Sequence, residues 1–243
     1  MRPSNRAPNQ MREVTIEVGV NKYAEGSCLI KFGNTHVLCN ASVEERVPPF
    51  LKGKKQGWIS AEYSMLPRST HSRMSRDNNG KPNGRALEIQ RLIARSLRST
   101  VNLNKLGERQ ITIDCDVIQA DGGTRCAAIT GGFVALNLAV NKILAQGLIK
   151  ENPLINSVAA ISCGIYNGEV ILDLDYEEDS KCEVDSNFIL NQNGEIIEVQ
   201  ATAEKGSMSF LQMTQVYELS KQAALQLLKI QQSVISKVYN LAE

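Results

Sequence analysis

The sequence predicts a layered α+β fold in which sheets pack against helices. Three observations predict it: strand-like and helix-like periodicities alternate along the chain, Asn-Gly turns join strand-like segments, and helical segments follow groups of strands. The chain has 243 residues, of which 42% are hydrophobic and 22% charged, so it can bury a core without disulfide or metal support. This composition excludes disordered, collagen-like and membrane-spanning classes.

Strand-like segments open the chain. Residues 13–20 alternate apolar and polar side chains, as a half-buried strand does. The same alternation recurs at 27–32, 35–43 and 58–65, and a Phe-Gly-Asn turn joins the first two of these as a hairpin. We therefore expect about four antiparallel strands before the first helix.

A polar loop and an amphipathic helix follow these strands. The loop at 67–83 has roughly 17 residues, and loops of that length inside compact domains are usually functional or disordered. The helix at 84–101 places its apolar side chains on one face and a stripe of arginines on the exposed side. This stripe consists of Arg91, Arg95 and Arg98.

The second half of the chain shares this rhythm of strands and helices. A strand at 109–118 leads through a tight glycine turn into an apolar helix at 126–146. Two Asn-Gly pairs, the strongest short-range hairpin signal, then predict two hairpins. Their strands are expected at 157–166, 169–175, 183–190 and 195–201, and a last helix is expected at 209–239.

Six cysteines are scattered along the chain without a CxxC pair. This spacing argues against a zinc site and a disulfide framework, and it favours buried thiols in a reducing compartment. Residues 1–12 are basic and polar, and no apolar run approaches the roughly 20 residues of a membrane span, so we expect neither a signal peptide nor a membrane protein. A cytoplasmic protein is the resulting expectation.

Charge is balanced overall but not locally. The formal net charge is +1, yet residues 1–100 carry 17 basic against 8 acidic side chains, and residues 101–243 carry 10 against 18. The stretch 68–98 holds eight basic and two acidic residues, whereas 173–185 holds seven acidic residues and one lysine. The basic stretch suits a polyanion, and the acidic stretch suits either a hard divalent cation or a solvated surface.

A glycine-rich turn lies between a strand and the start of the apolar helix. Gly122 and Gly123 let the backbone approach a ligand closely, and the free N–H groups at a helix start attract anions. Thr124 adds a hydroxyl, and Arg125 adds a forked cation suited to phosphate. The turn is neither a Walker loop nor a GxGxxG motif, and taken alone it is more simply explained as a tight turn with a helix cap.

Two carboxylates of the acidic stretch have a spacing that suits a metal. Asp179 and Asp185 are six residues apart, and an intervening turn would fold one carboxylate back toward the other. Two carboxylates together with substrate phosphate oxygens are the usual ligands of Mg²⁺ in proteins. The default interpretation of such a charge run is a solvated face, with Asp173 and Asp175 on one face of a strand.

Arginine dominates the basic stretch. Seven arginines and one lysine occur between residues 68 and 98, which fits phosphate or nucleic-acid contact better than solubility alone. No aromatic residues interleave with these arginines, so base stacking is not indicated, and the lone His36 and His71 are expected to be structural. The sequence shows no serine or cysteine nucleophile beside a base, so it does not indicate covalent catalysis. With the turn and the carboxylates, this pattern is typical of an enzyme that acts on phosphodiesters.

Four segments carry a family resemblance that extends over essentially the whole chain. They are GWISAEYSMLPR at 57–68, EIQRLIARSLR at 88–98, QADGGTR at 119–125, and LDLDYEED at 172–179, which is continued by Val184 and Asp185. These segments resemble the ribonuclease PH family of phosphate-dependent 3′→5′ exoribonucleases, which trim transfer RNA precursors. The resemblance implies a single domain over 1–243, built from duplicated β-α units of the ribosomal protein S5 domain 2-like type. It also implies a hexameric ring, a trimer of dimers.

The resemblance implies a reaction and the residues that perform it. Inorganic phosphate attacks the 3′-terminal phosphodiester of RNA and releases a nucleoside diphosphate, and the reverse reaction adds nucleotides. The family's phosphate-binding residues fall on Arg85, Gly123, Thr124 and Arg125. Its catalytic residues fall on Arg125 and on the acidic pair that binds Mg²⁺, Asp179 and Asp185. Its RNA-binding arginines fall on Arg68, Arg73 and Arg76, and Arg91 and Arg98 are expected to line the same cleft.

Two rival interpretations remain. A catalytically silent RNA-binding ring subunit would share the fold, as relatives in exosome-type assemblies do, but Arg85, Arg125, Asp179 and Asp185 together argue against it. A phosphate-binding metabolic enzyme does not explain the arginine-rich loop. The opening residues, Arg-Pro-Ser-Asn-Arg at 2–6, depart from the family's Arg-Pro-Asp-Gly-Arg start, and residues 206–211 are also atypical. We expect neither departure to touch the chemistry.

Overall fold

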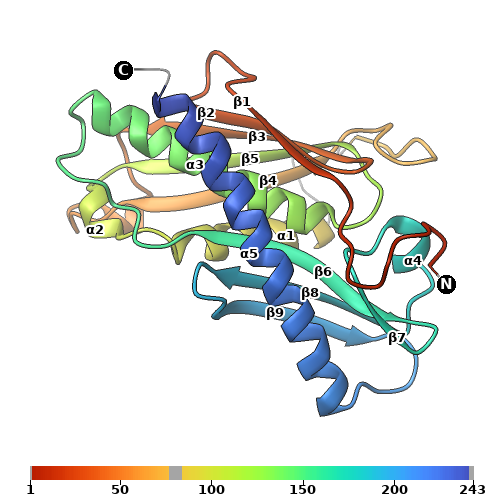
Figure 1. The fold of residues 1–243 in the computed structure, drawn as a ribbon. Helices are drawn as coiled ribbons and strands as arrows, with labels where there is room; N and C mark the ends of the chain where they lie inside the picture. Colours follow the sequence, from red (N-terminus) through yellow and green to blue (C-terminus); the bar gives the residue numbers. More distant parts are fainter. Residues whose placement is uncertain (1, 77–83, 241–243) are drawn as a thin grey trace.

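The strands of the molecule form two separate sheets. The computed structural model describes residues 2–76 and 84–240 (Figure 1). The first sheet has the strand order β1-β2-β3-β5-β4, and the second has the order β7-β6-β8-β9. The strands are β1 Val14–Val18, β2 Gly26–Phe32, β3 Thr35–Glu44, β4 Trp58–Met65, β5 Gln110–Gln119, β6 Val158–Tyr166, β7 Glu169–Leu172, β8 Val184–Asn191 and β9 Ile196–Ala203. The expected α+β class is confirmed.

The first sheet differs from the expectation at one strand. β1, β2 and β3 pair antiparallel in sequence order, with Cys28 opposite Cys39. β4 does not extend this meander: it pairs parallel with β5, which in turn pairs antiparallel with β3. The expectation of four antiparallel strands is therefore wrong for β4. Helix α1, Gly84–Arg98, crosses over from β4 to β5, and such a crossover through a helix joins parallel strands.

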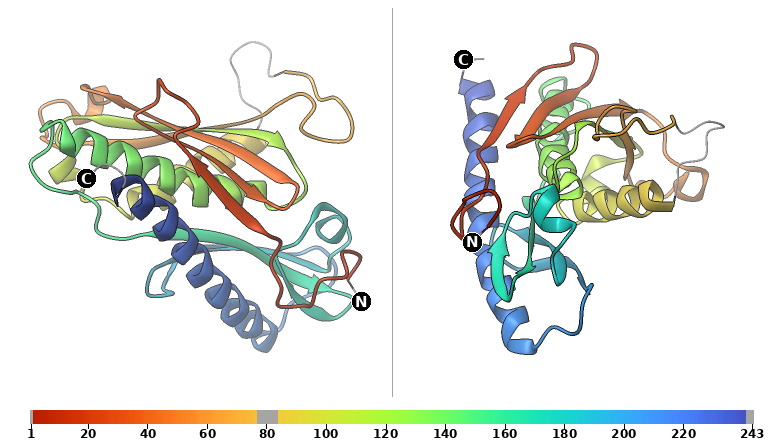
Figure 2. Two further views of the ribbon diagram at one scale, coloured as in Figure 1. Left: turned by 45° about the horizontal axis from the view of Figure 1, so that its top comes forward. Right: turned by 90° about the vertical axis from the view of Figure 1, so that its right-hand side faces the viewer.

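Helix α3, Thr124–Ala145, is the centre of the core. With α1 it covers one face of the first sheet, and it also packs against β6 of the second (Figures 1 and 2). Its close approach to β2 requires glycine at position 26, because a Cβ there would lie 2.1 Å from the carbonyl oxygen of Ala135. By length and composition, α3 is long and apolar enough to cross a membrane. The expectation that no apolar run approaches the length of a membrane span missed this helix. Within the fold, 78% of this apolar stretch is buried, as in the core helix of a globular protein.

The second sheet and helix α5, Phe210–Asn240, complete the fold. Both Asn-Gly hairpins occur as expected, β6 with β7 and β8 with β9. Helix α5 runs across both sheets and contacts β6, β7 and β1 (Figure 1). All six cysteines are buried and free, which confirms the expectation of buried thiols.

The acidic stretch folds differently from the strand that was expected. β7 ends at Leu172, and Asp173 has a left-handed backbone with φ of 54°, so Asp173 and Asp175 do not share a strand face. The Asp175 side chain accepts a hydrogen bond from the Glu178 N–H, and the Glu178 side chain accepts one from the Asp175 N–H. This capping box starts the short helix α4, Tyr176–Asp179. Two other unexpected short helices are η1 Pro49–Leu51 and α2 Leu103–Leu106.

Candidate active site

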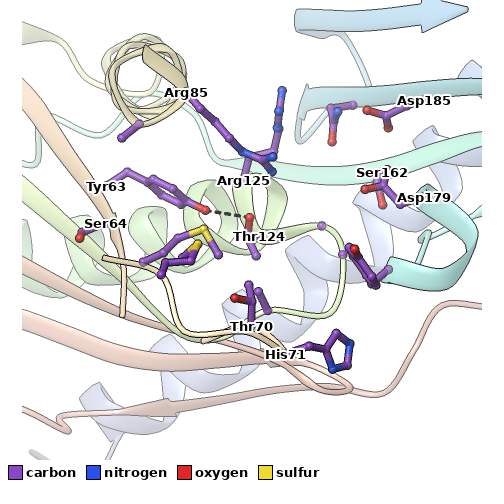
Figure 3. Close-up of a pocket in the computed structure, with 18 of the residues that line it drawn as sticks. Tyr63, Ser64, Thr70, His71, Arg85, Thr124, Arg125, Ser162, Asp179 and Asp185 are labelled. Atoms are coloured by element: carbon purple, nitrogen blue, oxygen red, sulfur yellow. Dashed lines mark hydrogen bonds between the residues drawn. The ribbon is translucent and has the colours of Figure 1, made fainter. Parts of the chain in front are cut away.

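A cavity of about 740 Å³ is lined by residues from both halves of the chain (Figure 3). Its walls come from the end of β4 and the loop after it, the start of α1, the glycine turn before α3, and α4 and β8. The predicted phosphate, catalytic and metal residues all line it: Arg85, Gly123, Thr124, Arg125, Asp179 and Asp185. The structure thus brings together the basic and the acidic candidates.

The glycine turn has the conformation that an anion site needs. Gly122 and Gly123 have left-handed backbones with φ of 73° and 68°, and Gly123 caps the N-terminus of α3. A Cβ on Gly122 would lie 2.5 Å from the carbonyl oxygen of Leu174, so this position requires glycine. The first N–H groups of a helix have no partner within it, and Gly123, Thr124 and Arg125 line the cavity. The turn is therefore both a helix cap and a candidate anion site.

The first two side chains of α3 are held in defined positions. The hydroxyls of Thr124 and Tyr63 are hydrogen-bonded at 2.8 Å (Figure 3). Arg125 Nη1 donates to Gln200 Oε1 at 2.7 Å and lies 3.6 Å from Glu88 Oε1. Gln200 donates in turn to Glu88 at 2.9 Å. Only Nη1 of Arg125 is engaged by the described residues, so its other donors are available to a ligand. Arg85 reaches the cavity beside Arg125 (Figure 3).

The two acidic candidates lie together on another wall of the cavity (Figure 3). Asp179 is the last residue of α4, and Asp185 lies on β8. Burial raises the pKa of Asp179, and the positive charges of Arg85 and Arg125 oppose this effect. Burial and the charge of Asp179 raise the pKa of Asp185 to about 6. Ionising both carboxylates is therefore unfavourable unless a cation joins them.

The donor set of this wall suits a hard divalent cation. Among the residues that the structure describes, no group of three or more His, Cys, Asp or Glu side chains is arranged to hold a metal. Mg²⁺ needs no such cage, because it keeps several waters and binds one or two carboxylates together with substrate phosphates. Asp179 and Asp185 provide two such carboxylates, and a cation would relieve their mutual repulsion. The residues present therefore fit Mg²⁺.

Comparisons with known proteins agree with this geometry. Two models of the 3′ exoribonuclease family match the chain, domain 1 over residues 10–141 and domain 2 over residues 156–223. The chain belongs to the 3′ exoribonuclease family. Relatives named ribonuclease PH from Caulobacter vibrioides and Roseobacter denitrificans are 56% and 57% identical over 236 and 234 residues, which cover 97% and 96% of this chain and 99% of each relative. The expected resemblance and the expected phosphorolytic 3′→5′ exoribonuclease class are confirmed.

Solved structures share the fold of this exoribonuclease at low sequence identity. Rice (Oryza sativa) Rrp46 matches it with a TM-score of 0.77 and 20% identity, over 96% of this chain and all of that one. An Archaeoglobus fulgidus exosome with RNA bound to the active site matches with a TM-score of 0.81 and 19% identity, over 94% of this chain and 91% of that one. At these identities the likeness shows the fold.

The loop arginines expected to bind RNA lie beside the cavity of the exoribonuclease and do not line it. They are exposed, and they flank loop residues 70–72, 74 and 75, which do line it. Arg68 donates to the carbonyl oxygen of His71 at 3.0 Å, a hydrogen bond within the loop. Residues 77–83 of the expected loop lie outside the described residues. The three arginines are Arg68, Arg73 and Arg76.

The two helix arginines expected in the same cleft lie elsewhere. Arg91 is exposed on α1 and does not line the cavity. The guanidinium of Arg98 lies 4.4 Å from the ring centre of Trp58 and donates to the carbonyl oxygen of Ile59 at 2.8 Å. Trp58 begins β4 and Met65, which lines the cavity, ends it, so about 23 Å of strand separates them. Arg98 therefore supports the start of β4.

Several residues of the cavity wall were not foreseen in the sequence. Tyr63 is buried at an inward position of β4, which the alternation of that strand could have indicated. His71, expected to be structural, lines the cavity, and its ring centre lies 5.7 Å from that of Tyr176. Ser162 and Asn187 complete the wall from β6 and β8. These four come together through tertiary packing, for which the sequence carries no local signal.

Three N-terminal arginines neutralise part of the acidic stretch. Arg2 and Glu178 form two hydrogen bonds of 2.8 Å, and their side chains are 1% and 0% exposed. Arg6 contacts Asp173 and Glu178 at 3.3 and 3.0 Å, and Arg12 contacts Asp173 at 2.7 Å. The interpretation of a solvated face is therefore wrong for Asp173 and Glu178. The opening residues do not line the cavity; Arg2, Ser4 and Arg6 contact Glu178, so this segment stabilises α4.

Proposed function

We propose that this chain trims the 3′ ends of transfer RNA precursors by phosphorolysis, with ribosomal RNA as a second class of substrate. Inorganic phosphate is the attacking group, nucleoside diphosphates are released, and the reverse reaction adds nucleotides. The observation that carries the proposal is the meeting of an anion-binding turn, two arginines and two carboxylates in one cavity. The name ribonuclease PH of relatives at 56% and 57% identity supports it.

The basic wall of the cavity binds the attacking phosphate in this proposal. Arg85 and Arg125 supply the cationic donors, the Thr124 hydroxyl adds a neutral one, and the N–H groups of the turn add the start of a helix. Phosphate and the scissile phosphodiester are both anions, so the wall must first hold them together against their repulsion. Positioning and electrostatics dominate phosphoryl transfer, and little acid–base chemistry is required of the chain.

The acidic wall holds Mg²⁺ in this proposal. Asp179 and Asp185 are its protein ligands, and their partial burial limits competition from bulk water. When bound, the ion supplies positive charge that neutralises phosphate oxygens. The chain itself fixes the distance between the two walls, because Leu174 and Asp175, which lead into α4, pack directly against the glycine turn at Gly122.

RNA and further copies of the chain are the proposed partners. Arg68, Arg73 and Arg76 are exposed beside the cavity entrance, where they suit contacts with RNA phosphates. The fold shared with an exosome that has RNA bound to its active site supports RNA as a partner. The fold shared with an archaeal exosome core supports assembly into an oligomer, and we propose a hexamer built as a trimer of dimers. Six free, buried thiols support a cytoplasmic location.

A time course with RNA that carries a labelled 3′-terminal nucleotide tests the reaction. With Mg²⁺ and phosphate we expect the label to appear as nucleoside diphosphate, and without phosphate we expect no release. Arg125→Ala should abolish the release, because it removes the fork that holds phosphate. Arg46→Ala is the matched control, since Arg46 pairs on the surface with Glu44 and lies outside the cavity lining.

Three other outcomes would contradict the proposal. Release of nucleoside monophosphate without phosphate would identify a hydrolase. Tight RNA binding without any release would favour the silent ring subunit. Phosphate-dependent release by Arg125→Ala at the normal rate would remove Arg125 from the site.

The loop arginines have a separate test. Replacing Arg68, Arg73 and Arg76 together by glutamine should weaken RNA binding and reduce the slope of log K against log salt by about two to three, because about one counterion is released per phosphate contact. Electrophoretic mobility shift at several salt concentrations measures both. Unchanged affinity and slope would show that the loop does not contact RNA.

A further inference from the structure

Arg12 joins the predicted phosphate-binding turn to the segment that leads into α4. Its side chain is 8% exposed. Two of its nitrogens bind the Asp173 carboxylate, Nε to Oδ2 at 2.9 Å and Nη2 to Oδ1 at 2.7 Å. The same guanidinium also reaches the backbone on both sides: Nη1 donates to the carbonyl oxygen of Asp121, and Nη2 lies 3.4 Å from the carbonyl oxygen of Gly122 in the turn and from that of Leu174 just before α4.

The turn and α4 also contact each other directly at this place. A Cβ on Gly122 would lie 2.5 Å from the carbonyl oxygen of Leu174, just before α4. The Asp121 carboxylate accepts a hydrogen bond from the Tyr176 N–H at 3.3 Å, at the first residue of α4. Arg12 therefore lies at the junction between the basic wall and the acidic wall of the cavity.

The carbonyl contacts of Arg12 determine how the turn faces the cavity. In a trans peptide, the carbonyl of one residue and the N–H of the next point in opposite directions. When the carbonyls of Asp121 and Gly122 point toward Arg12, the N–H groups of Gly122 and Gly123 point away from it. Thr35 assists by donating its hydroxyl to the Gly122 carbonyl at 2.6 Å and accepting from the Asp121 N–H at 2.9 Å.

We propose that Arg12 is a positioning residue for phosphorolysis, which holds the phosphate-binding turn in register with the α4 carboxylate. It does not touch the substrates, because its charge is neutralised by Asp173 and its donors are used by the protein. Arg12 thus acts on phosphate through the orientation of the turn. This inference rests on the proposed function and adds a residue to its machinery.

Arg6 provides a matched control in the same acidic cluster. Its side chain is 11% exposed and contacts Asp173, Asp175 and Glu178 at 3.3, 3.4 and 3.0 Å. Within residues 2–76 and 84–240, it makes no hydrogen bond to the turn at 121–125. Loss of Arg6 therefore removes a cation from the cluster without releasing the turn.

The test compares Arg12→Lys, Arg12→Met and Arg6→Met in the full chain. For each variant, the KM for phosphate and the kcat of phosphorolysis, the Kd for RNA without phosphate, and the rise in unfolding temperature caused by inorganic phosphate are measured. Lysine keeps a point charge beside Asp173 but lacks the fork that spans carboxylate and carbonyls. We expect Arg12→Lys to fold, to bind RNA normally and to raise the KM for phosphate about tenfold or more.

The outcomes separate this inference from its alternatives. Arg6→Met should lower the unfolding temperature and leave the KM for phosphate unchanged; an equal rise in KM would mean that loss of cluster charge suffices and would overturn the inference. A normal phosphate KM in Arg12→Lys would overturn it, and so would failure of Arg12→Lys to fold, because Arg12 would then serve the fold itself. A wild-type chain that releases no nucleoside diphosphate would instead contradict the proposed function. In that case, the rise in unfolding temperature caused by phosphate, compared between the wild-type chain and Arg12→Lys, would still test the role of Arg12.

Discussion

Two parts of one acidic stretch have opposite environments. Asp173 and Glu178 are buried and paired with arginines from the N-terminal segment. Asp179 and Asp185, a few residues further on, line the cavity and have no ion pair with the residues that the structure describes. Burial alone would raise the pKa of Glu178, but its hydrogen bonds from Arg2 hold that pKa below the ordinary value. For Asp185 burial prevails, and the pKa rises to about 6.

This difference separates acids that build the site from acids that act in it. Glu178 is neutralised within the chain, so it stabilises α4 and leaves no charge for a ligand. Asp185 forms no ion pair with a residue that the structure describes, and the charges of Arg125 and Arg85 do not offset its burial. A cation or a proton from solution would therefore neutralise it. Among the described residues, a direct ion pair with an arginine thus distinguishes the structural acids from the functional ones.

The largest effect is expected from the functional acids. Asp185→Asn removes a negative charge from the proposed Mg²⁺ site and should reduce phosphorolysis by about 1000-fold or more, because charge stabilisation carries most of such catalysis. The fold should remain intact, because the negative charge of Asp185 is disfavoured by burial and by Asp179. Release of labelled nucleoside diphosphate and the unfolding temperature measure the two effects. Phosphorolysis near the normal rate would remove Asp185 from the site.

The next largest effect is expected from the structural acids. Glu178→Gln leaves the buried guanidinium of Arg2 without its carboxylate and should lower the free energy of unfolding by about 3–5 kcal/mol. Glu177→Gln is the matched control on the same helix, because its ion pair with Lys181 is solvent-exposed and contributes little. Urea unfolding measures both. Equal stability of the two variants would show that the buried pair is not what holds α4.

The sequence predicted most of the fold and six of the residues that line the cavity, but not the difference between the two groups of acids. Alternating patterns and Asn-Gly turns gave the strands and hairpins, because these signals are local. The placement of β4 beside β5 depends on a crossover, and α4 depends on a capping box within a stretch that alternates like a strand. Arg2 and Glu178 are 176 residues apart, so no local pattern could have paired them.

A smaller effect is expected on the pH dependence of stability. Asp185 has a pKa of about 6 in the folded chain, against an ordinary value of 3.8, so between these values the folded form holds a proton that the unfolded form has lost. The contribution of this group to stability is therefore present at low pH and is lost as pH rises through 6. Asp185→Asn should gain about 2 kcal/mol over the natural chain between pH 4 and pH 7.5. Urea unfolding at several pH values measures this gain, and parallel curves for the two proteins would contradict it.

The smallest effect is expected from Mg²⁺ without substrate. An ion that binds the folded chain alone raises its stability, by about 1.4 kcal/mol at ten times the Kd, which is a rise of about 3–6 °C for a chain of this size. The rise should occur in the natural chain and in Glu177→Gln, and it should vanish in Asp185→Asn, where one of the two carboxylates is gone. Thermal unfolding with Mg²⁺ and with an equal ionic strength of NaCl separates binding from screening. If Asp185→Asn gains as much as the natural chain, the ion binds elsewhere, and the unpaired carboxylates of the cavity serve another cation or a proton.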